Sequence, residues 1–197
     1  MTSTEAEARR PGRPRSTEAD DAILEAAVEI FAEVGLAGLT VEGVAARAGV
    51  GKATIYRRYP GKVDLVVAAA RCFTQPQQAP PDTGTTRGDL AALVDGLITM
   101  LTTTPLGRAL PTLVAARTRV PELDLAYSEI VAEKRARSAV VIRRGIERGD
   151  LRADVDPEIV IDCYVSPIFY RFLITSAPLD VAFASEIVDA TMRAFGT

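Results

Sequence analysis

Apolar residues recur every three or four positions through most of the chain, which is the periodicity of amphipathic helices. Thr17 and Asp20 have the spacing of a capping box before the first such stretch, and Gly35 can take the positive φ that ends it. No segment alternates like a strand, so we expect an all-α fold of about nine helices. Besides this first helix, the pattern predicts long helices at about 61–73, 88–103, 106–118, 121–148, 157–175 and 181–195. Pro111 and Pro167 are expected to kink or interrupt the helices that contain them.

Two shorter helical patterns, within residues 40–48 and 52–58, flank a turn that contains Gly49. Thr40 is the predicted N-cap of the first, and Gly51 that of the second. Five basic residues and no acidic one lie between Gly43 and Val63, whereas the whole chain has a net charge of −3. A compact cationic helix after a helix and a turn is the composition of a helix-turn-helix that binds DNA. The basic residues are Arg47, Lys52, Arg57, Arg58 and Lys62.

The segment TVEGVAARAGVGKATIYRRYPGKVDL resembles the DNA-binding motif of TetR-family transcriptional repressors. The residues that carry the resemblance are Thr40, the run from Ala45 to Val50, Thr54-Ile55-Tyr56, Tyr59 and Lys62. The resemblance implies that Lys52, Ala53 and Thr54 face base edges and that Arg57 reads a guanine. It also implies phosphate contacts for Thr40, Tyr56, Arg58 and Lys62. The alternative is that these charges form only a solvated helix face, and for each residue the choice between base and phosphate stays open.

The N-terminus adds a second cationic element. Residues 9–15, RRPGRPR, contain no acid, and their Pro and Gly residues disfavour a helix. We expect residues 1–16 to be a disordered arm that lies in the minor groove, where arginine is favoured. A solubilising tail is the alternative. The arm's four arginines are Arg9, Arg10, Arg13 and Arg15.

Beyond the helix-turn-helix, which we assign to a domain at 17–73, a Pro- and Gln-rich linker spans 74–86. Residues 87–197 resemble the C-terminal part of one TetR subgroup, most clearly in PLGRAL, RGDLRADVDPE and SPIFYRFL. In that family this half binds a small effector and dimerises. The helix at 157–175 is apolar around most of its circumference and must be buried on all sides, by a second subunit or as the centre of a monomer. The expected residues of a dimer interface are Ile168, Phe183, Ile187 and Thr191.

The effector pocket is expected to have apolar walls and a few phenols, which would suit a hydrophobic or aromatic ligand. Arg117 could anchor an anionic ligand or form a salt bridge between helices. The same apolar residues could equally be ordinary core. The candidate lining residues are Leu97, Met100, Leu101, Leu110, Leu113, Val114, Tyr127, Tyr164, Phe169 and Phe172.

Composition narrows the function further. The chain has no His and two cysteines, Cys72 and Cys163, which we expect to be buried free thiols in a reducing cytoplasm. Without a His or cysteine cluster, a phosphate-binding glycine loop or a nucleophile beside a base, we expect no metal, no cofactor and no enzymatic activity. No apolar run approaches ~20 residues, so no membrane span is expected. The sequence thus predicts a ligand-responsive repressor that binds a palindromic operator as a homodimer, with a transcriptional activator or a helical oligomer that binds no DNA as alternatives.

Overall fold

The computed structural model describes residues 15–74 and 79–197. Within these ranges the chain is helical, and extended residues pair only in an isolated bridge between Leu151 and Gly196. The expected all-α fold is therefore confirmed. The helices are α1 (Arg15–Gly38), α2 (Val41–Ala48), α3 (Lys52–Tyr56), α4 (Lys62–Thr74), α5 (Thr86–Thr103), α6 (Pro105–Arg117), α7 (Pro121–Arg148), α8 (Pro157–Tyr170), the short π-helix η1 (Arg171–Thr175) and α9 (Val181–Phe195).

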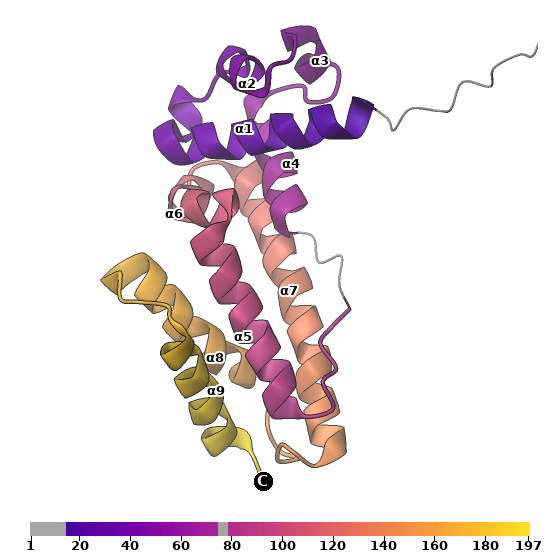
Figure 1. Ribbon diagram of the computed structural model, residues 1–197, viewed down its shortest axis with the longest axis vertical. Coiled ribbons are helices and arrows are strands. Elements are labelled where there is room, and N and C mark those ends of the chain that lie inside the picture. Colours follow the sequence, from indigo (N-terminus) through magenta and orange to yellow (C-terminus); the bar gives the residue numbers. More distant parts are fainter. Residues whose placement is uncertain (1–14, 75–78) are drawn as a thin grey trace, which may run out of the picture.

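The helices form two groups that meet along α1, α4 and α6 (Figure 1). Helices α1–α3 cap one end of the molecule, and α4 leads from them along the side of α7. The other group is built on the long helices α5 and α7, with α8 and α9 packed beside them. Phe31 of α1, Val44 of α2 and Ile55 of α3 are 1%, 0% and 0% exposed. These three N-terminal helices therefore share one core.

Helix α1 differs at both ends from the helix that the sequence predicts. It begins at Arg15, two residues before the expected cap Thr17. Gly35 does break the helix, because its φ of 66° and ψ of −176° are not helical, but a further turn continues to Gly38. A positive φ is inexpensive for a residue without a Cβ, so glycine places the break here. The extra turn carries the chain directly to Thr40, the cap of α2.

The two internal prolines lie within helices that continue past them. Helix α6 begins at Pro105 and continues through Pro111, and α8 continues through Pro167 to Tyr170. The predicted interruption falls four residues later, where α8 widens into η1 and the N–H of Arg171 bonds the carbonyls of Pro167 and Ile168. Pro167 removes only one backbone donor, and the exposed face on which it lies tolerates that loss.

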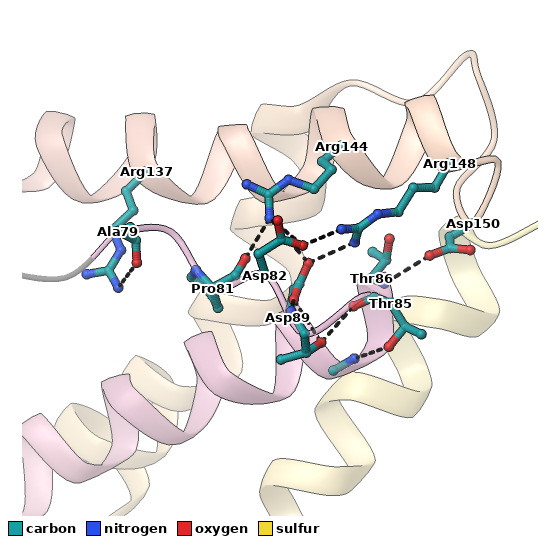
Figure 2. A network of polar contacts seen from close by, with 12 residues as sticks. Ala79, Pro81, Asp82, Thr85, Thr86, Asp89, Arg137, Arg144, Arg148 and Asp150 are labelled. Atoms are coloured by element: carbon teal, nitrogen blue, oxygen red, sulfur yellow. Dashed lines mark hydrogen bonds and ion pairs between the residues drawn. The ribbon is translucent and has the colours of Figure 1, made fainter.

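Part of the predicted linker, residues 79–82, is fastened along α7 by three arginines of one helix face (Figure 2). Arg137 donates to the carbonyl of Ala79 at 3.1 Å, and Arg144 donates to that of Pro81 at 2.9 Å. Arg148 bonds the carboxylate of Asp89 at 3.0 Å. The sequence does not reveal this contact, because residues 79–82 lie far from these arginines along the chain. Their role is to hold residues 79–82 and the start of α5 against α7.

Asp89 is the buried centre of this network. Its side chain is 0% exposed, yet Thr83 donates to it from its backbone N–H at 2.5 Å and from its hydroxyl at 2.8 Å. Burial acts to raise the pKa of Asp89, but the hydrogen bonds from Thr83 and Arg148 outweigh it, so the pKa lies below its ordinary value. Asp89 is therefore a charged group inside the fold, stabilised by its partners.

Three further findings concern composition. Both Cys72 and Cys163 are free and exposed, so the expectation that they are buried is wrong. Among the described residues, no three acidic or thiol side chains gather in a way that could hold a metal ion. No single described helix has both the length and the apolar character to cross a bilayer; α5 and α6 meet that criterion only together, across a bend of 84°.

Candidate nucleic-acid interface

The turn between α2 and α3 has the geometry that its sequence predicts. The hydroxyl of Thr40 accepts the N–H of Gly43 at 3.1 Å, which caps α2. Gly49 ends α2 with a φ of 67°, and the following N–H of Val50 returns to the carbonyl of Ala45 at 3.0 Å. Gly51, at φ −74°, precedes α3 without a side-chain cap. Because Ile55 is fully buried, α3 is anchored on one face and presents the other to solvent.

The solvent face of α3 and its last turn carry the predicted DNA-contacting residues. Lys52, Ala53, Tyr56 and Arg57 are exposed, with Tyr56 at 51%. Thr54 is half-buried. Thr40 lies on the surface at the start of α2, where its oxygen is already used as a cap acceptor and its O–H can still donate. Lys52 and Arg57 make this exposed surface of α3 polar and cationic, as expected of a helix that enters a DNA groove.

Most of the basic residues of this region already have partners. Lys52 pairs with Glu42 of α2 at 2.9 Å, and this hydrogen bond holds the pKa of the Glu42 carboxyl below its ordinary value. Arg47 bonds Glu33 of α1 at 2.7 and 2.8 Å, which lowers the pKa of Glu33 in the same way. Among the described residues, Arg57 is the one cation of this set whose side chain has neither an ion pair nor a hydrogen bond.

Two of the residues predicted to contact phosphates, Arg58 and Lys62, are bound to α1. Arg58 lies 2.6 Å from the carboxylate of Asp20, and both side chains are less than one-third exposed. The Nζ of Lys62 donates to the carbonyl of Leu36 at 2.7 Å. Both contacts tie the end of the helix-turn-helix to α1. For Arg58, α1 supplies the acid that the local sequence lacks. The phosphate contacts expected of these two cations stay a prediction.

The sequence could have shown part of this arrangement. Glu29 and Glu33 share one face of α1, Asp20 lies nearer the start of this helix, and α1 packs on α2 and α4. The count of charges within residues 43–63 omitted these acids because they lie ten or more positions earlier. Of the arginine arm, Arg9, Arg10 and Arg13 lie outside the described residues, whereas Arg15 begins α1 and so belongs to a helix.

The residues predicted to form a dimer interface lie in the core of the single chain. Ile168, Phe183, Ile187 and Thr191 are 0%, 8%, 6% and 3% exposed, so they cannot meet a partner without unpacking α8 and α9. The expectation was wrong about which face of these helices is free. An exposed apolar face lies on the opposite side, and we call it the outer face of α8. Its residues are Ile159, Cys163, Pro167, Tyr170, Ile174 and Val181.

The predicted pocket residues do not surround a described cavity. Leu101, Leu110, Leu113 and Tyr164 are buried, and the hydroxyl of Tyr164 donates to Ser138 at 2.7 Å. The other six are half-buried members of the same core: Leu97, Met100, Val114, Tyr127, Phe169 and Phe172. Two surface hollows lie elsewhere, and none of the ten residues lines either of them. Arg117 bonds Asp124 at 2.8 Å and lies 4.3 Å over the ring of Tyr127, so it has the salt bridge that was the alternative to a ligand anchor.

A helix-turn-helix at the end of an all-helical chain, with a cationic second helix on its surface, defines a class of DNA-binding regulators. Residues 23–69 match the model of bacterial regulatory proteins of the tetR family. Residues 80–191 match the tetracyclin repressor-like C-terminal domain. The chain belongs to the TetR family of transcriptional regulators, a family of DNA-binding proteins rather than of enzymes.

Individual relatives match most of the chain. The uncharacterized HTH-type transcriptional regulator YdeS of Bacillus subtilis is 31% identical over 185 residues, which cover 93% of this chain and 91% of YdeS. The crystal structure of the TetR family regulator SCO0332 is 33% identical, with a TM-score of 0.65, and the match covers 89% of this chain and 97% of that one. FadR of Bacillus subtilis, solved with stearoyl-CoA, shares the fold at 20% identity and a TM-score of 0.72, over 87% of this chain and 97% of FadR.

Proposed function

We propose that this regulator is a ligand-responsive repressor that acts in the cytoplasm, binds a palindromic operator as a homodimer and leaves it when a small effector binds. The observation that carries the proposal is the surface of α3, where exposed Lys52, Ala53 and Tyr56 lie beside Arg57, which has no ion pair within the described part of the chain. An arginine at the end of a recognition helix can bond O6 and N7 of a guanine at once. The family model that matches residues 80–191 is described as tetracyclin repressor-like, which supports repression.

The neighbouring residues have supporting roles in this proposal. Lys52 can exchange its contact with Glu42 for a phosphate or a base edge, because the pair is more than half exposed and such pairs are weak. Tyr56 and Thr40 offer O–H donors to phosphates, and Ala53 and Thr54 allow close approach to the groove floor. Arg58 and Lys62 contribute by fixing the orientation of α3 and α4 on α1. The arm with Arg9, Arg10 and Arg13 would add contacts in the minor groove.

The outer face of α8 supports the homodimer. Ile159 and Tyr170 of α8, Ile174 of η1 and Val181 at the start of α9 are 52%, 59%, 70% and 85% exposed, and exposed apolar side chains of this size favour burial against a partner. A second copy that places the same face against it would bury both by two-fold symmetry. Two reading surfaces related by that axis would then recognise two half-sites of a palindrome.

Release by an effector requires that the ligand prefer a conformation that does not bind DNA. The shared fold of FadR holds stearoyl-CoA, so a helical framework of this kind can admit a long apolar chain. An effector of this chain that entered among α5–α8 would have to open the packed core around Leu101 and Tyr164. We therefore expect a hydrophobic effector, coupled to operator binding by about 1–3 kcal/mol in both directions.

Selection from a random duplex pool tests the proposal. The parent protein should enrich a palindrome with half-sites about one helical turn apart. The Arg57→Ala variant should enrich the same palindrome with one position in each half-site degenerate. If the parent enriches no sequence, the protein is not an operator-binding regulator.

A further inference from the structure

An open groove lies between the end of α1 and the second half of α6, on the side of the molecule where the two helix groups meet. Its volume of about 720 Å³ is within the range of roughly 300–1,000 Å³ that small-molecule sites occupy. We call it the α1–α6 groove. Its walls are formed by Val34, Gly35, Leu36, Ala37, Lys62, Pro111, Thr112, Ala115, Ala116, Arg119 and Val120.

The charges of this lining are of one sign. Lys62 and Arg119 are its only ionisable residues, and the remaining residues are apolar apart from one hydroxyl and one glycine. The ammonium of Lys62 uses one of its three donors on the carbonyl of Leu36 and keeps two. Arg119 is exposed and has no acidic partner among the described residues. An apolar trough with two under-used cations is complementary to a molecule with an apolar body and a negative head.

We propose that the α1–α6 groove is a binding site for a small amphipathic anion, such as a carboxylate with an aliphatic chain. The apolar body lies along Val34, Ala115 and Val120, and the carboxylate meets Arg119 and Lys62. This site differs from the predicted core pocket, because none of that pocket's residues lines it. Ligand entry here requires no opening of the core.

The groove lies next to the residues that lead into the helix-turn-helix, so an occupant can affect DNA binding. The residues Gly35 to Ala37 follow the break in α1 and lie directly before Thr40, the cap of α2. An occupant therefore presses on the segment that carries the helix-turn-helix, and it touches Lys62, which ties α4 to α1. This regulatory step rests on the proposed operator binding, whereas the binding site itself does not.

Calorimetric titration of the full chain with decanoate, and with decanol as an uncharged match, tests the site without DNA. One equivalent of decanoate should bind per chain. The Arg119→Gln substitution should weaken the binding of decanoate by about two- to fivefold and leave the binding of decanol unchanged. Ala115→Trp should fill the groove and abolish both, since Ala115 is exposed and the added ring needs no core space. Arg143→Gln, an exposed cation on α7, is the control and should change nothing.

The proposal is overturned if decanoate binds no better than decanol, or if it binds equally well to parent, Arg119→Gln and Ala115→Trp. The same titration with the selected operator present tests the regulatory step. Weaker decanoate binding on DNA supports it, and unchanged binding overturns it. If decanoate binds the groove but no operator can be selected, the site stands and the proposed function alone fails.

Discussion

At the scale of single residues, charge counts along the sequence do not show which cations are available. Five basic residues surround α3, but Arg47 and Arg58 face acids of α1, Lys62 a carbonyl of α1, and Lys52 an acid of α2. The sequence predicted the polar surface of α3 because helix periodicity fixes which residues share a face. It could not predict the pairing, because that depends on the tertiary contact between α1 and the helix-turn-helix.

Alanine substitutions of Arg57 and Arg58 should therefore have different effects, although the two residues are neighbours. Arg57→Ala should cost about 1–3 kcal/mol of operator affinity and relax the preference at one base of each half-site. Arg58→Ala should leave base preference intact and lower the free energy of unfolding by about 1 kcal/mol, because Asp20 loses its partly buried partner. Operator titrations and urea denaturation of both variants, with Arg143→Ala as the control, check this. Equal effects of the two variants on base preference would be incompatible with the pairing.

Asp89 should make stability depend on pH. Its pKa lies below the ordinary 3.8, so its charge stabilises the fold at neutral pH, and this contribution is lost as the pH falls from about 5 through the folded-state pKa. Asp89→Asn should lower the free energy of unfolding by about 1–3 kcal/mol at pH 7, and the difference from the parent should become smaller in acid. Denaturation midpoints at several pH values measure both. Asp95→Asn, an exposed carboxyl on the same helix, should stay within about 0.5 kcal/mol of the parent at each pH.

At the scale of elements, periodicity and caps predicted most helix positions. The observed bounds of α7 and α9 agree with the predicted ones. Pro121 begins α7, Gly149 ends it with a positive φ, and the carboxylate of Asp180 caps α9. The start of α1, the π-turn after Tyr170 and the binding of residues 79–82 to α7 were not foreseen. Those features depend on contacts between segments far apart in the chain.

Two glycines, Gly145 of α7 and Gly96 of α5, should respond in opposite ways to replacement by alanine. A Cβ on Gly145 of α7 would lie 2.5 Å from the hydroxyl oxygen of Thr86, so α5 can approach only a glycine. We expect Gly145→Ala to destabilise the fold by about 1–3 kcal/mol through overpacking. Gly96→Ala, in an exposed part of α5 with open space around it, should instead stabilise by about 0.5–1 kcal/mol. Thermal denaturation of both variants compares them, and a stabilising Gly145→Ala would show that the α5–α7 packing is looser than described.

At the scale of the whole molecule, the fold class could be predicted from the sequence, but the face of α8 that is left exposed could not. A helix that is apolar all round has two faces of similar composition, and composition does not say which of them packs on the core of its own chain. The structure places Ile168 of α8 and Ile187 of α9 inward, at 0% and 6% exposed, and Tyr170 of α8 outward, at 59%.

The two faces should respond differently to a charge. Tyr170→Glu should leave a folded monomer, because it disrupts only the outer face of α8. Ile187→Glu should unfold the chain, at a cost of more than about 4 kcal/mol for an unpaired charge in the core. Leu125→Glu, at a site on α7 that is 63% exposed, should remain a folded dimer. Light scattering and circular dichroism separate these outcomes, and a monomeric parent at micromolar concentration would refute the proposed assembly.

The most direct measurement is an anisotropy titration of the selected palindrome and of a scrambled duplex of the same composition, across a range of salt concentrations. If α3 reads the operator, the palindrome should bind at least about 10³-fold more tightly than the scrambled duplex at physiological salt. Both affinities should fall linearly with the logarithm of salt concentration, because neutralised phosphates release counterions. Equal affinity for the two duplexes, or an affinity that does not change with salt, would contradict sequence-specific DNA binding by this protein.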